Sequence, residues 1–198
     1  MTRVRMMRFV SAVLVLAMPM AAGDAIAAPT PCAISAWSAD PDPAGLNVRA
    51  APRADAPVVG RLPPPRRVGG ETIAVELRIV AGENGWFLID RAEFADYGEP
   101  NKTGMVFTGR GWVSGRLLSL ALNGPALHAR PAADAAKRAT LVGEDADGNV
   151  YGPDAFAVER LHACRDTWVE VEGRLRGPNT RHRGWTDRTC SNQVTTCP

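Results

Sequence analysis

The chain lacks an excess of charge of either sign once its first 27 residues are set aside. Those residues hold Arg3, Arg5 and Arg8 against Asp24, so 20 basic and 20 acidic side chains remain of the 23 and 21 in the whole chain. General attraction to nucleic-acid phosphates or to an anionic membrane surface requires a basic excess. We therefore expect neither nucleic acid nor a membrane surface as a partner.

Common catalytic signatures are also missing. The sequence has no Gly-x-Ser-x-Gly elbow, no phosphate-binding loop, no His-Glu-x-x-His and no Cys-x-x-Cys pair. We expect no catalysis, no cofactor and no bound metal. The alternative is an envelope enzyme with an unrecognised site around His162, Asp166 and nearby arginines, which would need a reduced cysteine or a metal ion.

Long apolar runs are absent except at the amino terminus. Residues 9–22 are mostly apolar, follow the three arginines, and precede the small-x-small pattern of Ala25, Ile26 and Ala27. This run is shorter than the roughly 20 residues that span a bilayer. It predicts a signal peptide over 1–27, cleaved after Ala27, with no membrane span afterwards. The mature protein is expected in the periplasm or outside the cell.

Cysteine is scarce but evenly numbered. All four cysteines lie after the predicted cleavage site, at Cys32, Cys164, Cys190 and Cys197. An even number in an oxidising compartment indicates two disulfides, for which three connectivities exist.

Helical periodicity is rare, and short alternating runs separated by turn residues dominate the mature chain. This pattern predicts an all-β protein. We expect strands over 46–49, 57–62, 73–80 and from 86, a polar loop over 91–108, and a last strand starting at 111.

The same order of features occurs twice. Residues 127–130 match 46–49, and a tryptophan follows the first leucine after 41 residues in the second half and 40 in the first. Arg183, Gly184 and Trp185 then repeat residues 110–112. The repeat predicts two small β domains, over 32–122 and 123–198.

The first repeat resembles the bacterial SH3-like (SH3b) domain. Residues 46–52 read leucine-x-valine-arginine-x-x-proline, and glycine-tryptophan-valine closes the unit at 111–113. The second copy departs from this pattern at Ala129, in the valine position, and at Thr186, after the closing tryptophan. The resemblance implies two tandem small SH3-like β-barrels behind the signal peptide.

The last hairpin also suggests a disulfide. If Trp168 and Trp185 face each other on adjacent antiparallel strands, Cys164 and Cys190 come almost opposite, because paired positions have a nearly constant sum. We therefore predict Cys164–Cys190, which leaves Cys32 for Cys197. A short Cys190–Cys197 loop is the rival arrangement.

Two groups of side chains are candidate ligand contacts. The first is an aromatic set, because aromatic side chains are common anchors of recognition; it comprises Trp37, Trp86, Tyr97 and Trp112, with Phe87 beside them. The second is an arginine group near the end of the chain that includes Arg181 and Arg183, whose guanidinium forks suit carboxylates. The structural alternatives are a barrel core for the aromatics and solvated ion pairs for the arginines.

The resemblance implies a non-catalytic binding or adaptor module of the periplasm or cell envelope, recognising peptidoglycan peptides or an envelope protein. A secreted module that binds or inhibits another protein is the further alternative. Nothing in the sequence predicts an oligomeric state.

Overall fold

The computed structural model describes residues 28–95, 97 and 104–194 of the 198-residue chain. Within these ranges the chain forms strands and two short 3-10 turns, η2 (Gly115–Leu117) and η3 (Pro153–Ala155), without an α-helix. The predicted all-β class is confirmed. The predicted signal peptide at 1–27 lies outside the described residues, in which no helix is long and apolar enough to cross a membrane.

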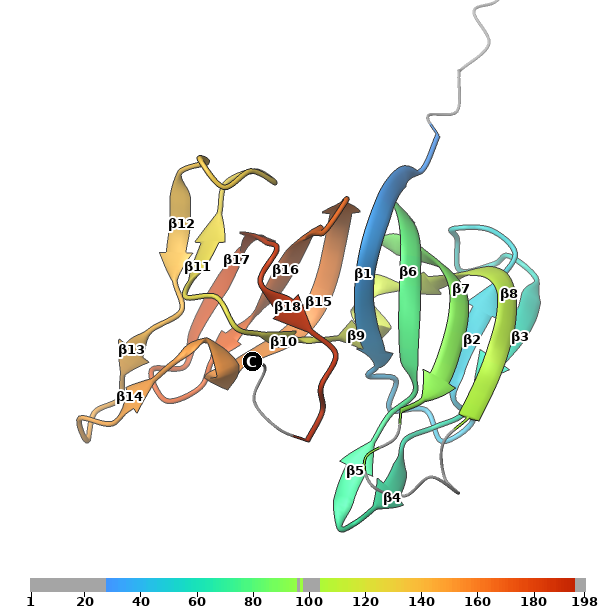
Figure 1. The fold of residues 1–198 in the computed structure, drawn as a ribbon, viewed down its shortest axis with the longest axis horizontal. Coiled ribbons are helices and arrows are strands. Elements are labelled where there is room, and N and C mark those ends of the chain that lie inside the picture. The colour runs from blue at the N-terminus through green and yellow to red at the C-terminus, as the bar shows by residue number, and fades with distance from the viewer. Residues whose placement is uncertain (1–27, 96, 98–103, 195–198) are drawn as a thin grey trace, which may run out of the picture.

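The first half folds as a curled, seven-stranded sheet in the order β3-β2-β8-β7-β6-β1-β9 (Figure 1). A small hairpin of β4 (Arg66–Val68) and β5 (Glu71–Ile73) projects from it. The sheet strands are β1 (Thr30–Ser38), β2 (Leu46–Arg49), β3 (Val58–Leu62), β6 (Glu76–Glu83), β7 (Trp86–Phe94), β8 (Gly104–Ser114) and β9 (Leu118–Ser119).

The second half is built on a five-stranded sheet in the order β12-β11-β17-β16-β15. Its strands are β11 (Ala126–His128), β12 (Lys137–Thr140), β15 (Phe156–Arg165), β16 (Trp168–Leu175) and β17 (Thr180–Thr186). Two further pairs join β13 (Gly143–Glu144) to β14 (Val150–Tyr151) and β10 (Ala121–Leu122) to β18 (Thr189–Cys190).

The two sheets repeat one strand order. The run β3-β2-β8-β7-β6 of the first sheet has the counterpart β12-β11-β17-β16-β15 in the second. Trp86 and Trp112 lie on the neighbouring strands β7 and β8, and Trp168 and Trp185 lie on the neighbouring strands β16 and β17. The internal duplication seen in the sequence therefore extends to the topology.

The structure aligns β2 of the first half with β11 of the second half differently from the sequence match. Arg49 pairs with Trp112 and donates from Nη1 to the Ala56 carbonyl (2.8 Å). His128 pairs with Trp185, and its Nδ1 lies 3.0 Å from the Ala135 carbonyl. In both cases the carbonyl belongs to the residue seven positions later. His128 is thus the counterpart of Arg49, and the match of 127–130 with 46–49 is wrong by two residues. Leu46 and Val48 are both buried, so the buried Leu127 could correspond to either of them. The match of leucine to leucine therefore did not fix the alignment of the two strands.

Two predicted boundaries are also corrected. The predicted strand 73–80 is interrupted at Ala74, whose backbone N–H donates to Gln193 Oε1 (2.8 Å) while Gln193 Nε2 donates to its carbonyl (3.1 Å). A side chain from the end of the chain therefore takes the place of a neighbouring strand. The predicted loop 91–108 is shorter than expected, because β7 continues to Phe94 and β8 begins at Gly104.

A continuous apolar core joins the two halves. The buried cluster includes Phe87 and Leu118 from the first half and Leu161 from the second. At the same contact Ser119 Oγ donates to the Val158 carbonyl (3.0 Å). The edge strand β15 thus packs directly against the first half (Figure 1).

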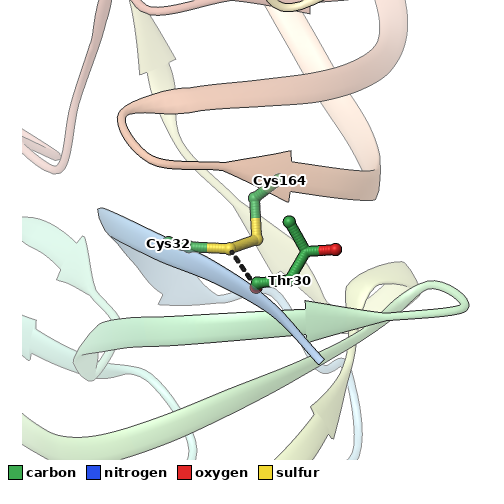
Figure 2. Close-up of a disulfide and its surroundings, with 3 residues drawn as sticks. All are labelled: Thr30, Cys32 and Cys164. Carbon is green, nitrogen blue, oxygen red and sulfur yellow. Dashed lines mark hydrogen bonds between the residues drawn. A yellow bond between two sulfur atoms is a disulfide. The ribbon is translucent and has the colours of Figure 1, made fainter. Parts of the chain in front are cut away.

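A disulfide crosses this contact between Cys32 on β1 and Cys164 on β15 (Figure 2). Backbone bonds surround it: Ala33 N donates to the Asp166 carbonyl (2.7 Å), and Asp166 N to the Pro31 carbonyl (2.9 Å). Both sulfurs are buried among side chains of the two halves, with Cys32 9% and Cys164 3% exposed.

The predicted Cys164–Cys190 bond is therefore wrong, and so is Cys32–Cys197. The constant-sum argument assumed that the strand bearing Trp168 runs back to Cys164, but a turn at Asp166 (φ 52) separates them. Cys164 lies on β15 and pairs with Val169 of β16, whereas Trp185 lies on β17. Cys190 is also disulfide-bonded, and Cys197 lies outside the described residues.

Candidate binding groove at the junction of the halves

A groove of roughly 410 Å³ opens where β15 meets the first half, and we call it the junction groove. The first half supplies all of its walls except one side chain, Arg160 of β15. The lining residues are Asp40, Leu46, Asn47, Arg49, Ala54, Asn84, Gly85, Trp86, Ser114, Arg116, Leu117 and Arg160.

The β6–β7 turn places Trp86 at the groove. Asn84 (φ 49) and Gly85 (φ 79) both adopt left-handed backbone conformations, which asparagine and glycine tolerate best. The Gly85 carbonyl accepts from Gly115 N (2.9 Å), which fixes the turn against η2. Trp86 then packs beside Leu88 and Trp112 on the outer face of the sheet, half-buried and at the rim of the groove.

Arg160 is the unusual side chain of the groove. Its Nε is buried without a hydrogen-bond partner among the described residues. Its Nη2 lies close to the turn, 3.7 Å from where a Cβ on Gly85 would be. Arg66 Nε is likewise unpaired, but the Arg66 guanidinium lies 3.6 Å above the Phe94 ring, a favourable cation–π contact.

The groove is electropositive. Arg49, Arg116 and Arg160 line it against a single carboxylate, Asp40. Leu46, Ala54, Leu117 and the Trp86 ring supply its apolar lining. Such a mixture suits a small anionic ligand with an apolar body.

The predicted arginine candidates lie elsewhere and are paired within the protein. Arg183 makes a two-pronged bond to Glu170, from Nε (3.0 Å) and Nη2 (2.9 Å), and this bond raises the pKa of Arg183. Arg181 bonds Glu159 and, at 3.0 Å, Glu172. These contacts form a cross-strand ladder of opposite charges on β15, β16 and β17.

The aromatic candidates are dispersed. Trp112 is buried in a small cluster with Leu88, while Trp37 on β1 lines a separate cleft near the chain end. Tyr97 is half-buried beyond β7, where its hydroxyl bonds Glu76 and accepts from Gln193 N (3.2 Å). Of the predicted site residues, Trp86 lines the junction groove, and Trp37, Tyr97, Trp112, Arg181 and Arg183 do not.

Tyr97 should ionise only in strongly alkaline solution. Burial, followed by the hydrogen bond to Glu76, raises its pKa from 10.0 to about 12. Because the folded-state pKa is raised, the associated stability is present below pH 10 and is lost between about pH 10 and 12. Tyrosinate absorbance should show Tyr97 ionising near pH 12, and Tyr97→Phe should remove that step. A step near pH 10 assigned to Tyr97 would show that its hydroxyl is not held by Glu76 and Gln193.

His162 and Asp166, the residues of the enzyme alternative, both have hydrogen-bond partners within the fold. His162 Nε2 lies 2.8 Å from Glu172, and this hydrogen bond lowers the pKa of Glu172. Asp166 forms the β15–β16 turn and bonds β1 through its backbone. The described ranges contain no cluster of three metal-ligating side chains and no free cysteine.

Sequence reasoning missed Arg160 and Arg116. No sequence signal singles Arg160 out, because only the contacts show that Glu159 and Glu172, the carboxylates nearest to it, bond Arg174, Arg181 and His162 instead. Its approach to Trp86 depends on how the halves pack.

Comparison with known proteins gives no identification: no protein-family model, no curated protein and no solved structure matches this chain.

Proposed function

We propose that this chain is a non-catalytic binding module of the bacterial cell envelope, composed of two tandem SH3-like barrels. The SH3-like assignment is supported by the motif residues at 46–52 and by the strand order that both sheets share. The Cys32–Cys164 bond supports a location in the periplasm or outside the cell, because disulfides persist in oxidising compartments.

The observation that carries the proposal is the junction groove, with Trp86 at its rim and the unpaired Arg160 in its wall. Its volume lies near the lower end of the range for small-ligand sites. A stable protein–protein contact instead covers about 800 Å² on each partner. The size and charge of the groove therefore favour a small anionic ligand, and peptidoglycan peptides, which carry carboxylates, have this chemistry.

Co-sedimentation of the oxidised mature chain, residues 28–198, with purified peptidoglycan sacculi tests this function. We expect saturable binding that persists in moderately high salt, because the apolar wall contributes as well as charge. Trp86→Ala and Arg160→Gln should each weaken binding by about tenfold, the effect of losing one well-formed contact.

The matched control is the double variant Arg181→Ala/Arg183→Ala. It removes two exposed cations that are already paired with Glu159, Glu170 and Glu172, so we expect sacculus binding close to that of the unmodified chain. Absence of sedimentation above a non-binding protein would overturn the wall-binding function and make an envelope protein the favoured partner.

A further inference from the structure

We propose that Arg160 is a ligand-binding residue that holds the terminal carboxylate of a short peptide in the junction groove. This inference rests on the proposed function in taking that groove as the binding site, but it specifies which chemical group of the ligand enters and which side chain receives it.

The first observation is that the Arg160 guanidinium has no anionic partner among the described residues. Arg160 is half-buried and its Nε is enclosed, and buried polar groups are almost always paired. Several arginines elsewhere in the described chain have carboxylate partners, among them Arg78 with Asp90 (2.6 Å) and Arg174 with Glu159 (3.3 Å), whereas others, such as the exposed Arg116, have none. Arg160 has none, although its cross-strand neighbour is Glu172.

The fold itself keeps Glu172 away from Arg160. Glu172 Oε2 accepts from His162 (2.8 Å) and Oε1 from Arg181 (3.0 Å), so both of its oxygens are engaged. Arg160 turns instead toward Gly85 of the opposite half. An external anion in the groove would supply the partner that the protein does not.

The second step is the choice of anion. A guanidinium presents a planar fork that matches a carboxylate in two parallel hydrogen bonds. Because Arg160 Nε is inaccessible, the fork available to a ligand is the pair of terminal nitrogens. The apolar wall of Leu46, Leu117 and Trp86 lies in the same groove and suits small side chains next to that carboxylate. A bare inorganic anion would leave this wall uncovered.

The experiment uses the oxidised mature chain, with the indole N–H signal of Trp86 in nuclear magnetic resonance spectra as the readout. Trp86→Phe assigns that signal among the five tryptophans. The probes are trialanine with a free carboxyl terminus, trialanine amide, and inorganic phosphate. We expect trialanine to shift the signal saturably and the amide to bind at least tenfold more weakly. Phosphate should bind more weakly than trialanine.

Arg160→Gln tests the residue, with Arg53→Gln as the control, since Arg53 is exposed and paired with Asp55. We expect Arg160→Gln to abolish the difference between trialanine and its amide. Its melting temperature should be unchanged or raised, because a half-buried guanidinium with an enclosed, unpaired Nε is removed. A structural role for Arg160 would instead lower the melting temperature.

Equal shifts by trialanine and its amide, or unaltered binding by Arg160→Gln, would overturn the inference. Phosphate binding as tight as trialanine would replace the carboxylate assignment with a general anion site. The two proposals fail separately: Arg160-dependent trialanine binding without sacculus binding would remove only the wall target. Sacculus binding that does not depend on Arg160 would remove only the carboxylate contact.

Discussion

Removing the Cys32–Cys164 disulfide is expected to lower the free energy of unfolding by about 4–5 kcal/mol. The two cysteines are 132 residues apart, and in the chain-entropy account the stabilisation grows with the length of the closed loop. The variant is Cys32→Ala/Cys164→Ala, and the measurement is denaturant unfolding under oxidising conditions. A loss of this size is a large fraction of the stability of an ordinary domain.

The control is the double variant Cys190→Ala/Cys197→Ala. With Cys32 and Cys164 joined and Cys190 also bonded, Cys197 is the remaining cysteine of the chain, so we expect peptide mapping to find Cys190 linked to it. That link closes a short loop and should contribute about 2–3 kcal/mol. Equal losses in the two double variants would contradict the loop-length argument.

The same bond should influence the junction groove. Cys164 lies on the strand that carries Arg160, and its Sγ would be 2.7 Å from a Cβ on Gly82, at the end of the β6–β7 hairpin that bears Trp86. Reduction should therefore loosen the strand that holds Arg160 near Trp86. We expect weaker sacculus binding by the reduced protein.

Phe87→Ala is expected to cost about 3–5 kcal/mol, the usual range for deleting a buried aromatic ring. Phe87 is fully buried on β7 and belongs to the core that joins the halves. Its ring packs beneath η2, where a Cβ on Gly115 would lie 2.5 Å from it and 2.2 Å from the Leu161 carbonyl. A cavity at this point would weaken the sheet and the contact with β15 together.

Urea unfolding of Phe87→Ala beside Met105→Ala measures this effect. Met105 is 47% exposed on β8, so its truncation should change the free energy of unfolding by no more than about 0.5 kcal/mol. If the two variants lost similar stability, the core at the junction would not be packed as described.

Local sequence patterns were sufficient for the elements made by neighbouring residues. The alternation at 46–49 gave β2 at its observed bounds, and the turn residues before Trp86 marked the start of β7. The paired tryptophans identified adjacent strands in both halves. Each of these features depends on side-chain periodicity or on backbone conformations that asparagine and glycine tolerate, so it is encoded within a few residues.

Features that join distant segments required the tertiary structure. At the strand break, Ala74 bonds the side chain of Gln193, more than a hundred positions away. The disulfide depends on β1 lying beside β15, and a single turn at Asp166 moves Cys164 off the strand on which the sequence argument placed it. The sum of paired positions is constant only within one hairpin, so the sequence argument could not detect that turn.

The candidate site shows the same division. The sequence by itself determined an all-β chain with a duplicated unit, and it selected Trp86, because composition, alternation and spacing are properties of the chain alone. Arg181 and Arg183 were chosen for their charge, but cross-strand glutamates pair with both. Only the tertiary structure decided that Arg160 has no carboxylate partner and what lies next to it. Burial and pairing depend on how the two halves pack, and that packing brings Arg160 and Trp86 to one groove from positions 74 residues apart.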